Sequence, residues 1–254
     1  MSRASFRAIP SLFAHRGCSR NAPENTLAAF RLAAEREIPG IELDVQFAAS
    51  GEVVVIHDDS LARLAGVDAP VAAIEWAELR TVDVGGWFGE EYRSERIPLL
   101  DEVLETFGTG MFFDIELKTK LRRNDRLPYA VADIINRHNL CDGCIVSSFN
   151  PFAVGAIAAV NRGAAKPIAT AAIYANDDGV PRLLRHGAGV LLGRCGIAKP
   201  QWNQAGRLPT LRHHLFGRRV AAWTVNERET AKRLFEAGVD AVISDVPEAL
   251  LDLI

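Results

Sequence analysis

Two acidic side chains, Glu42 and Asp44, alternate with apolar residues in the segment 40–47. In a strand, both carboxylates point to one face with Cα atoms about 6.5–7 Å apart, and the apolar residues between them face the other way. Two carboxylates that point into a barrel repel one another and lose hydration, which is costly unless a cation compensates. Because the ligands are all oxygen, the pair predicts a site for one hard divalent cation, Mg2+ or Ca2+.

A second acidic segment, 113–118, repeats this spacing. Asp114, Glu116 and Lys118 share one face of a strand, and the last two lie nearest its carboxyl end. Two interpretations remain open. Glu116 and Lys118 form an ion pair with each other, or Glu116 is a third metal ligand beside an ammonium group that contacts phosphate.

Two histidines end strand-like segments. His15 precedes Arg16 where the first apolar run ends, and a strand that simply turns into a loop is the alternative to a functional role. His57 closes the run 53–57 and is followed by two aspartates, which we expect to orient the imidazole or to cap the next segment. A single histidine is more often structural than catalytic. The run that carries His57 neighbours the carboxylate strand, however, and this favours a function.

The elements that must position these residues alternate between short strands and longer helices. The run 53–57 follows the strand at 40–47 after a turn too short for a helix, so we expect it to run antiparallel to that strand. Residues 60–97 are predicted to form a small insertion beside the mouth of the fold. Strands are predicted at 9–15, 40–47, 111–117, 144–148, 167–173, 188–193, 219–225 and 240–244, and helices at 26–37, 98–107, 127–137, 151–160, 227–237 and 247–253.

Eight strands with intervening helices predict a (β/α)8 TIM barrel as a single domain over residues 1–254. A doubly wound open sheet is disfavoured, because no glycine-rich turn follows the first strand. Active sites of barrels lie at the carboxyl ends of the strands. At the end of the seventh strand, Trp223 is explained by core packing more readily than as a substrate wall. At the end of the eighth, Ser244 or Asp245 is expected to cap the last helix.

Composition narrows the classes of partner and location. The chain has 254 residues, of which 48% are hydrophobic, and a formal net charge of −3. That charge gives no reason to expect nucleic acid or an anionic membrane surface as a partner. No apolar run reaches the length of about 18 residues that a membrane span needs, and no signal peptide is evident. Four sparse cysteines are typical of a reduced cytoplasmic protein. The oligomeric state is open, a homo-oligomer included.

Taken together, seven short motifs resemble the glycerophosphodiester phosphodiesterase family. Each motif alone is weak, but their order and spacing over the whole chain make a strong combined signal. They are AHRG at 14–17, PENT at 23–26, IELDV at 41–45, VVVIHD at 53–58, IELK at 115–118, WTVN at 223–226 and VDAVISDVP at 239–247.

The resemblance implies a (β/α)8 barrel with an insertion after the second strand and hydrolysis of a small glycerophosphodiester to glycerol 3-phosphate and an alcohol. Within PENT, Thr26 is expected to cap the first helix. Support of the metal site is left open for Glu24 and Asn25, and capping is the alternative for Asn25. The implied roles are metal binding for Glu42, Asp44 and Glu116, general acid and base catalysis for His15 and His57, phosphate contact for Arg16 and Lys118, and an aromatic wall near the glycerol for Trp223.

Two other functions stay open. A lysophospholipase D-type enzyme that acts on lysolipids ranks second, because no exposed apolar helix for interfacial binding is evident in the sequence. A catalytically silent barrel that binds phosphodiester head groups is disfavoured by the intact histidine pair and carboxylates.

Overall fold

The computed structural model describes residues 9–120 and 125–254. Residues 1–8, which belong to the segment searched for a signal peptide, lie outside this range. Within the described residues, eight parallel strands form a closed barrel, because β1 pairs with both β2 and β9. The barrel strands are β1 Leu12–His15, β2 Gly40–Phe47, β4 Phe112–Leu117, β5 Cys144–Ser148, β6 Ala169–Tyr174, β7 Ile197–Pro200, β8 Arg219–Ala222 and β9 Ala241–Ser244.

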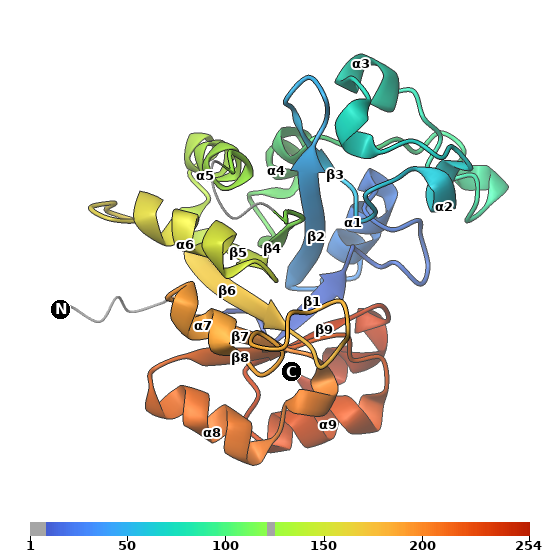
Figure 1. Ribbon diagram of the computed structural model, residues 1–254. Coiled ribbons are helices and arrows are strands. Elements are labelled where there is room, and N and C mark those ends of the chain that lie inside the picture. The colour runs from blue at the N-terminus through green and yellow to red at the C-terminus, as the bar shows by residue number, and fades with distance from the viewer. Residues whose placement is uncertain (1–8, 121–124) are drawn as a thin grey trace.

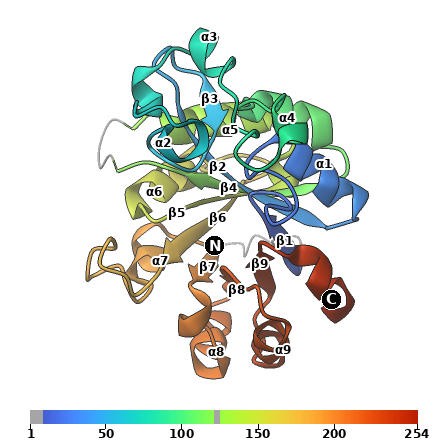
Figure 2. The ribbon, with the colours of Figure 1, turned by 90° about the vertical axis from the view of Figure 1, so that its right-hand side faces the viewer.

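Helices surround the barrel, as Figures 1 and 2 show. They are α1 Leu27–Glu35, α4 Leu100–Phe107, α5 Leu127–Arg137, α6 Pro151–Val160, α7 Ala188–Leu192, α8 Arg207–Leu215, α9 Arg228–Glu236 and the 3-10 helix η5 Pro247–Leu253, with short 3-10 turns η3 Cys141–Gly143 and η4 Trp202–Gln204. The predicted (β/α)8 fold is therefore confirmed. Among the described residues, every helix is too short or too polar to cross a membrane.

The predicted antiparallel run is β3, Val53–Val55, which pairs with the end of β2. The insertion that follows contains α2 Ala62–Ala65, η1 Val71–Ala73, α3 Trp76–Leu79 and η2 Glu90–Tyr92. Its apolar side chains form a cluster of their own, which includes Val54 and Ile56. In Figures 1 and 2, α2 and α3 lie at the opposite end of the molecule from α8 and α9.

Side chains inside the barrel are arranged in layers. An apolar layer that includes Phe13, Ile145 and Ile243 fills the end where the strands begin. The apolar residues of β2 face outward and pack in the larger cluster between barrel and helices, as the alternation predicted. Polar residues occupy the interior towards the carboxyl ends, so the strand pattern places the candidate site at the expected mouth.

The predicted strand at 188–193 is wrong, because this segment is helix α7 and the sixth barrel strand is β7. A short apolar run is compatible with a buried strand or a buried helix, and periodicity alone does not separate them. β7 was missed because Lys199 and Pro200 are atypical of a strand interior. Pro200 is the last residue of β7, and Lys199 finds partners inside the barrel.

Helix α8 also contradicts the expectation that no apolar helix is exposed. Leu208, Leu211 and Leu215 recur on one side of α8, and all three are more than half exposed. Thr210, on the opposite side of the helix, is buried. The apolar stripe of α8 therefore faces outward.

The loop between β1 and α1 depends on a glycine. Gly17 has a φ of +80°, and a Cβ at this position would lie 2.7 Å from the Cβ of Ala29. The next residue, Cys18, donates its backbone N–H to the carbonyl of Ala29. This close approach fixes the turn that carries His15 and Arg16 towards the mouth.

Gly17→Ala is expected to lower the free energy of unfolding by about 2–4 kcal/mol, because it combines a left-handed backbone with a steric clash. Urea denaturation measures this change. Gly110→Ala is the matched control: its Cβ meets nothing within 4 Å, so we expect a change within about 0.5 kcal/mol. Equal stability of both variants and wild type would contradict the assignment.

Candidate functional site

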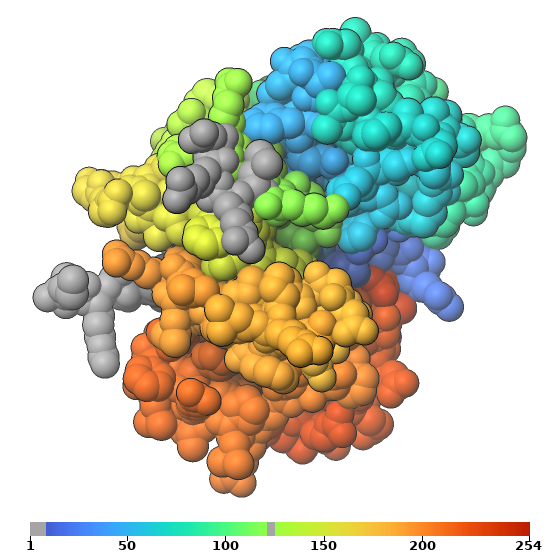
Figure 3. Space-filling model, viewed as in Figure 1, coloured from blue at the N-terminus to red at the C-terminus, as the bar shows by residue number. Residues whose placement is uncertain are grey.

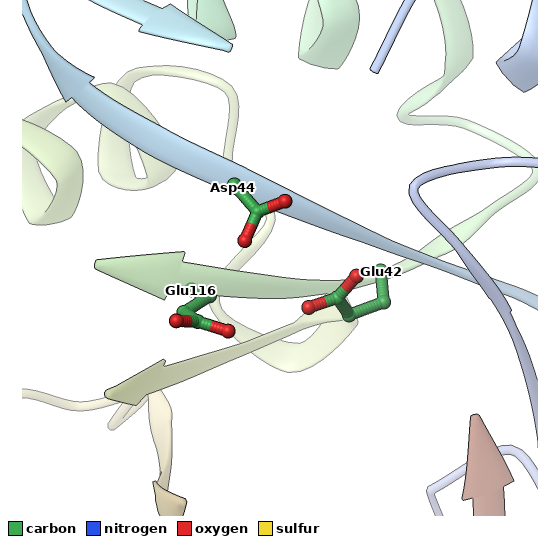
Figure 4. Close-up of side chains that lie close together, drawn as sticks. All are labelled: Glu42, Asp44 and Glu116. Atoms are coloured by element: carbon green, nitrogen blue, oxygen red, sulfur yellow. The ribbon is translucent and has the colours of Figure 1, made fainter. Parts of the chain in front are cut away.

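Three carboxylates meet at the carboxyl ends of β2 and β4. Glu42 and Asp44 extend from β2, and Glu116 lies opposite Asp44 in the register of the two strands. One carboxylate oxygen from each residue lies within 4.8 Å of one oxygen from each of the other two, and all three side chains are buried. Figure 4 shows the three groups turned towards a common point. The structure thus brings together the three predicted metal ligands.

Two cations border this cluster at the mouth. The Nζ of Lys118 lies 2.8 Å from Oε1 of Glu116 and 3.3 Å from Oδ1 of Asp44. The Nε of Arg16 lies 3.3 Å from Oδ2 of Asp44. Burial alone would raise the pKa of Asp44, but Lys118 and Arg16 prevail and lower it. The ion pair between Glu116 and Lys118 therefore exists within the acidic cluster, so the two interpretations of this segment are compatible.

Arg16 has a strained backbone, with a φ of 56° in the left-handed region. For a residue with a side chain, this conformation costs about 1–3 kcal/mol, and it persists only where the surrounding structure imposes it. The Nη1 of Arg16 donates to Glu24 at 2.9 Å, and its backbone N–H donates to Oε2 of Glu42 at 3.3 Å. Its Nε is buried and makes no hydrogen bond among the described residues. A donor is therefore held ready beside the carboxylates.

The PENT segment supports the site from the first loop. Asn25 donates its Nδ2 to Oδ2 of Asp44 at 2.9 Å and accepts from the Asp44 backbone N–H at 3.3 Å. Thr26 caps α1 by accepting from the N–H of Ala29, as expected. Glu24 pairs with Arg16 and with Arg63 of the insertion. The alternatives left open by the sequence are thereby resolved: Asn25 orients Asp44, and Glu24 links Arg16 to the insertion.

A lysine that the sequence analysis missed lies deeper in the barrel. Lys199 of β7 is buried, and its Nζ lies 2.8 Å from Oδ2 of Asp114 and 3.5 Å from Oε1 of Glu42. Ser147 accepts a hydrogen bond from the same ammonium group at 3.2 Å. Burial would lower the pKa of Lys199, but Asp114 and Glu42 outweigh it and raise the pKa. The predicted position of the sixth barrel strand, 188–193, hid Lys199. The available signal was the segment Ile-Ala-Lys-Pro at 197–200, which stands where the alternation of strands and helices calls for a strand.

His15 is held by Asp245, a residue that the sequence suggested as a helix cap. Its Nδ1 lies 2.5 Å from Oδ1 of Asp245, and its Nε2 lies 3.9 Å from Oε2 of Glu42. Asn226 in turn donates to Asp245 at 2.7 Å. Burial would lower the pKa of His15, but the charge of Glu42 and the hydrogen bond with Asp245 raise it.

Asp245 is therefore not the N-cap of the last helix. The helix η5 has no side-chain cap, and the hydroxyl of Ser244 accepts instead from the N–H of Val246. Barrel closure explains this result, because β9 lies directly beside β1. Residues 230 positions apart in sequence become neighbours at the mouth.

His57 has an equivalent arrangement on the other side. Its Nδ1 lies 2.7 Å from Oδ1 of Asp58, whose other oxygen accepts from Nε of Arg63 at 2.6 Å. The expectation that an aspartate orients His57 is confirmed. In both histidines the carboxylate contacts Nδ1, which leaves Nε2 as the nitrogen for other partners.

Trp223 lies immediately after β8 at the rim. Its Nε1 donates to the carbonyl of Lys199 at 3.0 Å, and its ring packs edge-to-face against Phe149 at 5.6 Å between centroids. It also packs on the apolar layer of the barrel interior while remaining partly exposed. These contacts fix the indole at the end of the barrel where the carboxylates lie.

The donor set fits a divalent cation. Three carboxylates supply oxygen ligands alone, which is the chemistry of Mg2+ and Ca2+ sites. Burial, together with the charges of Asp44 and Glu116 and against the opposing effect of Lys199, raises the pKa of Glu42 to about 7. The cluster therefore carries more negative charge than its surroundings compensate, and a divalent cation would balance it. Among the described residues, this is the single group of three or more potential ligands found.

The chain is similar to known proteins over nearly its whole length. Residues 15–249 match the Glycerophosphoryl diester phosphodiesterase family. A glycerophosphodiester phosphodiesterase from Caldanaerobacter subterraneus subsp. tengcongensis is 33% identical, and the match covers 96% of this chain and 97% of that protein.

Solved structures show the same fold. A phosphodiesterase from Oleispira antarctica in complex with the product sn-glycerol-3-phosphate has a TM-score of 0.83 and 30% identity, with 96% of both chains covered. A glycerophosphodiester phosphodiesterase from Thermotoga maritima has a TM-score of 0.73 and 23% identity, which supports the fold alone; 98% of this chain and 100% of that chain are covered.

Lys199→Met is expected to lower the free energy of unfolding by about 3–5 kcal/mol, because it leaves two buried carboxylates without their cation. Urea denaturation measures the loss. Adding Asp114→Asn should restore part of it. Lys120→Met is the control, since Lys120 is 88% exposed and pairs with an exposed aspartate; we expect a change below about 0.5 kcal/mol. A Lys199→Met protein as stable as the control variant would contradict the role of Lys199.

Proposed function

Because the chain belongs to the glycerophosphoryl diester phosphodiesterase family, we propose that it hydrolyses glycerophosphodiesters to glycerol 3-phosphate and an alcohol, with a divalent cation and a pair of histidines. The observation that carries this proposal is the gathering of three carboxylates, two oriented histidines and two cations at the mouth of one barrel. The product named for the Oleispira antarctica structure supports the same substrate class.

Glu42, Asp44 and Glu116 would hold the cation, with Asn25 fixing the orientation of Asp44. When bound, a divalent cation supplies positive charge that neutralises phosphate oxygens and polarises the phosphorus. The oxygen ligands accommodate both Mg2+ and Ca2+. Lys199, which lies deeper in the barrel, lowers the free-energy cost of burying the carboxylate of Glu42.

Arg16 and Lys118 bind the phosphodiester. Both pair with carboxylates of the site, and a phosphate group offers oxygens of the same charge. Arg16 suits this role because its Nε is already buried with no hydrogen bond among the described residues. Fixed positive groups of this kind stabilise the negative charge of the transition state without reorganisation.

The histidines transfer the protons. One of His15 and His57 accepts the proton of the nucleophile as its oxygen bonds to phosphorus. The nucleophile is water, which gives glycerol 3-phosphate directly, or the neighbouring glycerol hydroxyl, which gives a cyclic phosphate that water then opens to glycerol 3-phosphate. The other donates a proton to the leaving alkoxide as the second P–O bond breaks. Asp245 and Asp58 each contact the Nδ1 of one histidine, so that Nε2 serves as the transferring nitrogen of both. Trp223 forms an apolar wall beside the glycerol.

The four cysteines support a cytoplasmic location for this reaction. Cys18, Cys141, Cys144 and Cys195 are all free and buried. Free thiols persist in reducing compartments, whereas oxidising ones favour disulfides.

We expect the protein to release glycerol 3-phosphate from glycerophosphocholine. This release should stop in EDTA and resume when Mg2+ or Ca2+ is added. Coupled detection of glycerol 3-phosphate measures the rate, and circular dichroism in EDTA verifies that the protein remains folded. Release that continues at full rate after exhaustive chelation would contradict the role of the three carboxylates. A folded protein without turnover at any metal concentration would point to the silent binder.

His15→Ala and His57→Ala should each lower kcat by about 10²–10⁴-fold, because each removes one proton transfer. The same release assay measures the loss. His138→Ala serves as the control, because His138 pairs with Asp101 of α4 and not with a residue of the site; it should retain wild-type turnover. Near-wild-type rates in both His15 and His57 variants would refute the assignment.

A lysophospholipase D-type activity is the second candidate. The exposed apolar stripe of α8 supports it, because the apolar helix that the sequence did not reveal is present. The two candidates share all of the chemistry and differ in the group attached to glycerol. The ratio of kcat/KM on lysophosphatidylcholine to that on glycerophosphocholine decides between them.

A further inference from the structure

The region 179–226 differs in charge from the rest of the chain. It contains eight Arg and Lys residues and no Asp or Glu, although the whole chain has a formal net charge of −3. This segment runs from the loop before α7 to the residues after β8, and includes both α7 and α8. Lys199 lies inside the barrel, and Arg185 and Arg219 each pair with an aspartate. The other five basic residues are arginines that give this part of the surface a positive charge, so the expectation drawn from net charge does not apply to it.

Apolar side chains on the same two helices are exposed to an unusual degree. On α7 these are Leu191 and Leu192; on α8 and just after it they are Leu208, Leu211, Leu215 and Phe216, with exposed fractions between 52% and 77%. Leu191, Leu208 and Phe216 line one groove of about 660 Å³. Contiguous apolar patches on a protein surface mark interaction sites. We refer to these six residues as the α7–α8 apolar face.

Arginines without acidic partners flank this face. Arg182, Arg194, Arg207 and Arg212 are exposed, and no ion pair involves any of them among the described residues. Arg218 lies 5.4 Å from the ring centroid of Phe216. In Figure 3 the orange surface of α7 and α8 forms an outer face of the molecule, away from the insertion. Exposed leucines beside unpaired arginines are the composition of a helix that lies in a membrane interface.

We propose that the α7–α8 apolar face docks on an anionic phospholipid surface, with its leucines and Phe216 in the interface and the flanking arginines on lipid phosphates. The arginines that have no acidic partner among the described residues complement such a surface, where each nearby Lys or Arg adds attraction. A second copy of the chain is a poor occupant, because a symmetric dimer would place arginines against arginines.

The docking face is connected to the mouth of the barrel. The 3-10 turn η4 directly precedes α8, and the backbone N–H of Trp202 in this turn donates to the carbonyl of Trp223 at 2.7 Å. Gln204 donates to the carbonyl of Arg185 at 2.9 Å and so joins this turn to the loop before α7. A docked molecule would therefore hold its rim beside the lipid surface. This inference does not depend on the proposed function.

The test is flotation of the purified full-length protein with vesicles of phosphatidylglycerol and phosphatidylcholine in equal parts, and with phosphatidylcholine alone. We expect binding to the anionic vesicles and loss of that binding at high salt. Leu208→Gln/Leu215→Gln and Arg207→Gln/Arg212→Gln should each weaken it at least about tenfold, because one removes apolar burial and the other charge attraction. Val67→Gln/Arg80→Gln, two exposed residues of the insertion, should bind as wild type.

Three results would overturn the proposal: no binding of wild type to anionic vesicles at low salt, equal binding by all variants, or a dimer in light scattering that the leucine variant dissociates without any vesicle binding. All variants should turn over water-soluble glycerophosphocholine at the wild-type rate, because none of the changed residues belongs to the mouth. Absence of turnover in wild type would refute the proposed function and leave the vesicle result intact.

Discussion

Burial of negative charge is the constraint on which the rest of this barrel depends. Glu42, Asp44, Asp114 and Glu116 extend into the interior from two adjacent strands. Carboxylates in such a place are tolerated only when cations and hydrogen bonds replace the lost water. This compensation is supplied by Lys199, Lys118, Arg16 and Asn25.

The compensation is layered along the barrel axis. Lys199 serves the deeper pair, Glu42 and Asp114, where it is buried and permanent. Lys118 and Arg16 serve Asp44 and Glu116 at the mouth, where they remain partly exposed. The inner cation thus has a structural role, whereas in the function that we propose the outer cations exchange a carboxylate for a phosphate. The need to pair buried carboxylates with cations therefore explains both the inner ion pairs and the cations at the mouth.

Each histidine is likewise held by an acidic partner, but the two partners come from different parts of the fold. Asp245 reaches His15 only because β9 closes against β1, and Asn226 fixes Asp245 from the end of β8. His57 receives its aspartate from the next residue, and the insertion adds Arg63. One histidine is therefore positioned by barrel closure and the other by a local turn braced by the insertion. Damage to the insertion and damage to the barrel would disturb different halves of the pair.

Local pattern alone was enough to predict several features. The alternation around Glu42 and Asp44 predicted the inward carboxylates, the short turn before β3 predicted its antiparallel pairing, and the motifs predicted the family. These features depend on the period of a strand or on neighbours in the chain, which a sequence states directly. The predicted roles of the individual site residues stay predictions.

Tertiary structure alone decided the remainder. Lys199 was invisible because its strand lacks an apolar pattern, and its charge is stable only against carboxylates from strands distant in sequence. Asp245 looked like a helix cap because capping is local, whereas its histidine lies 230 positions away. The outward face of α8 was hidden for the same reason, since an apolar stripe specifies that a helix has two sides but not which side the fold will cover.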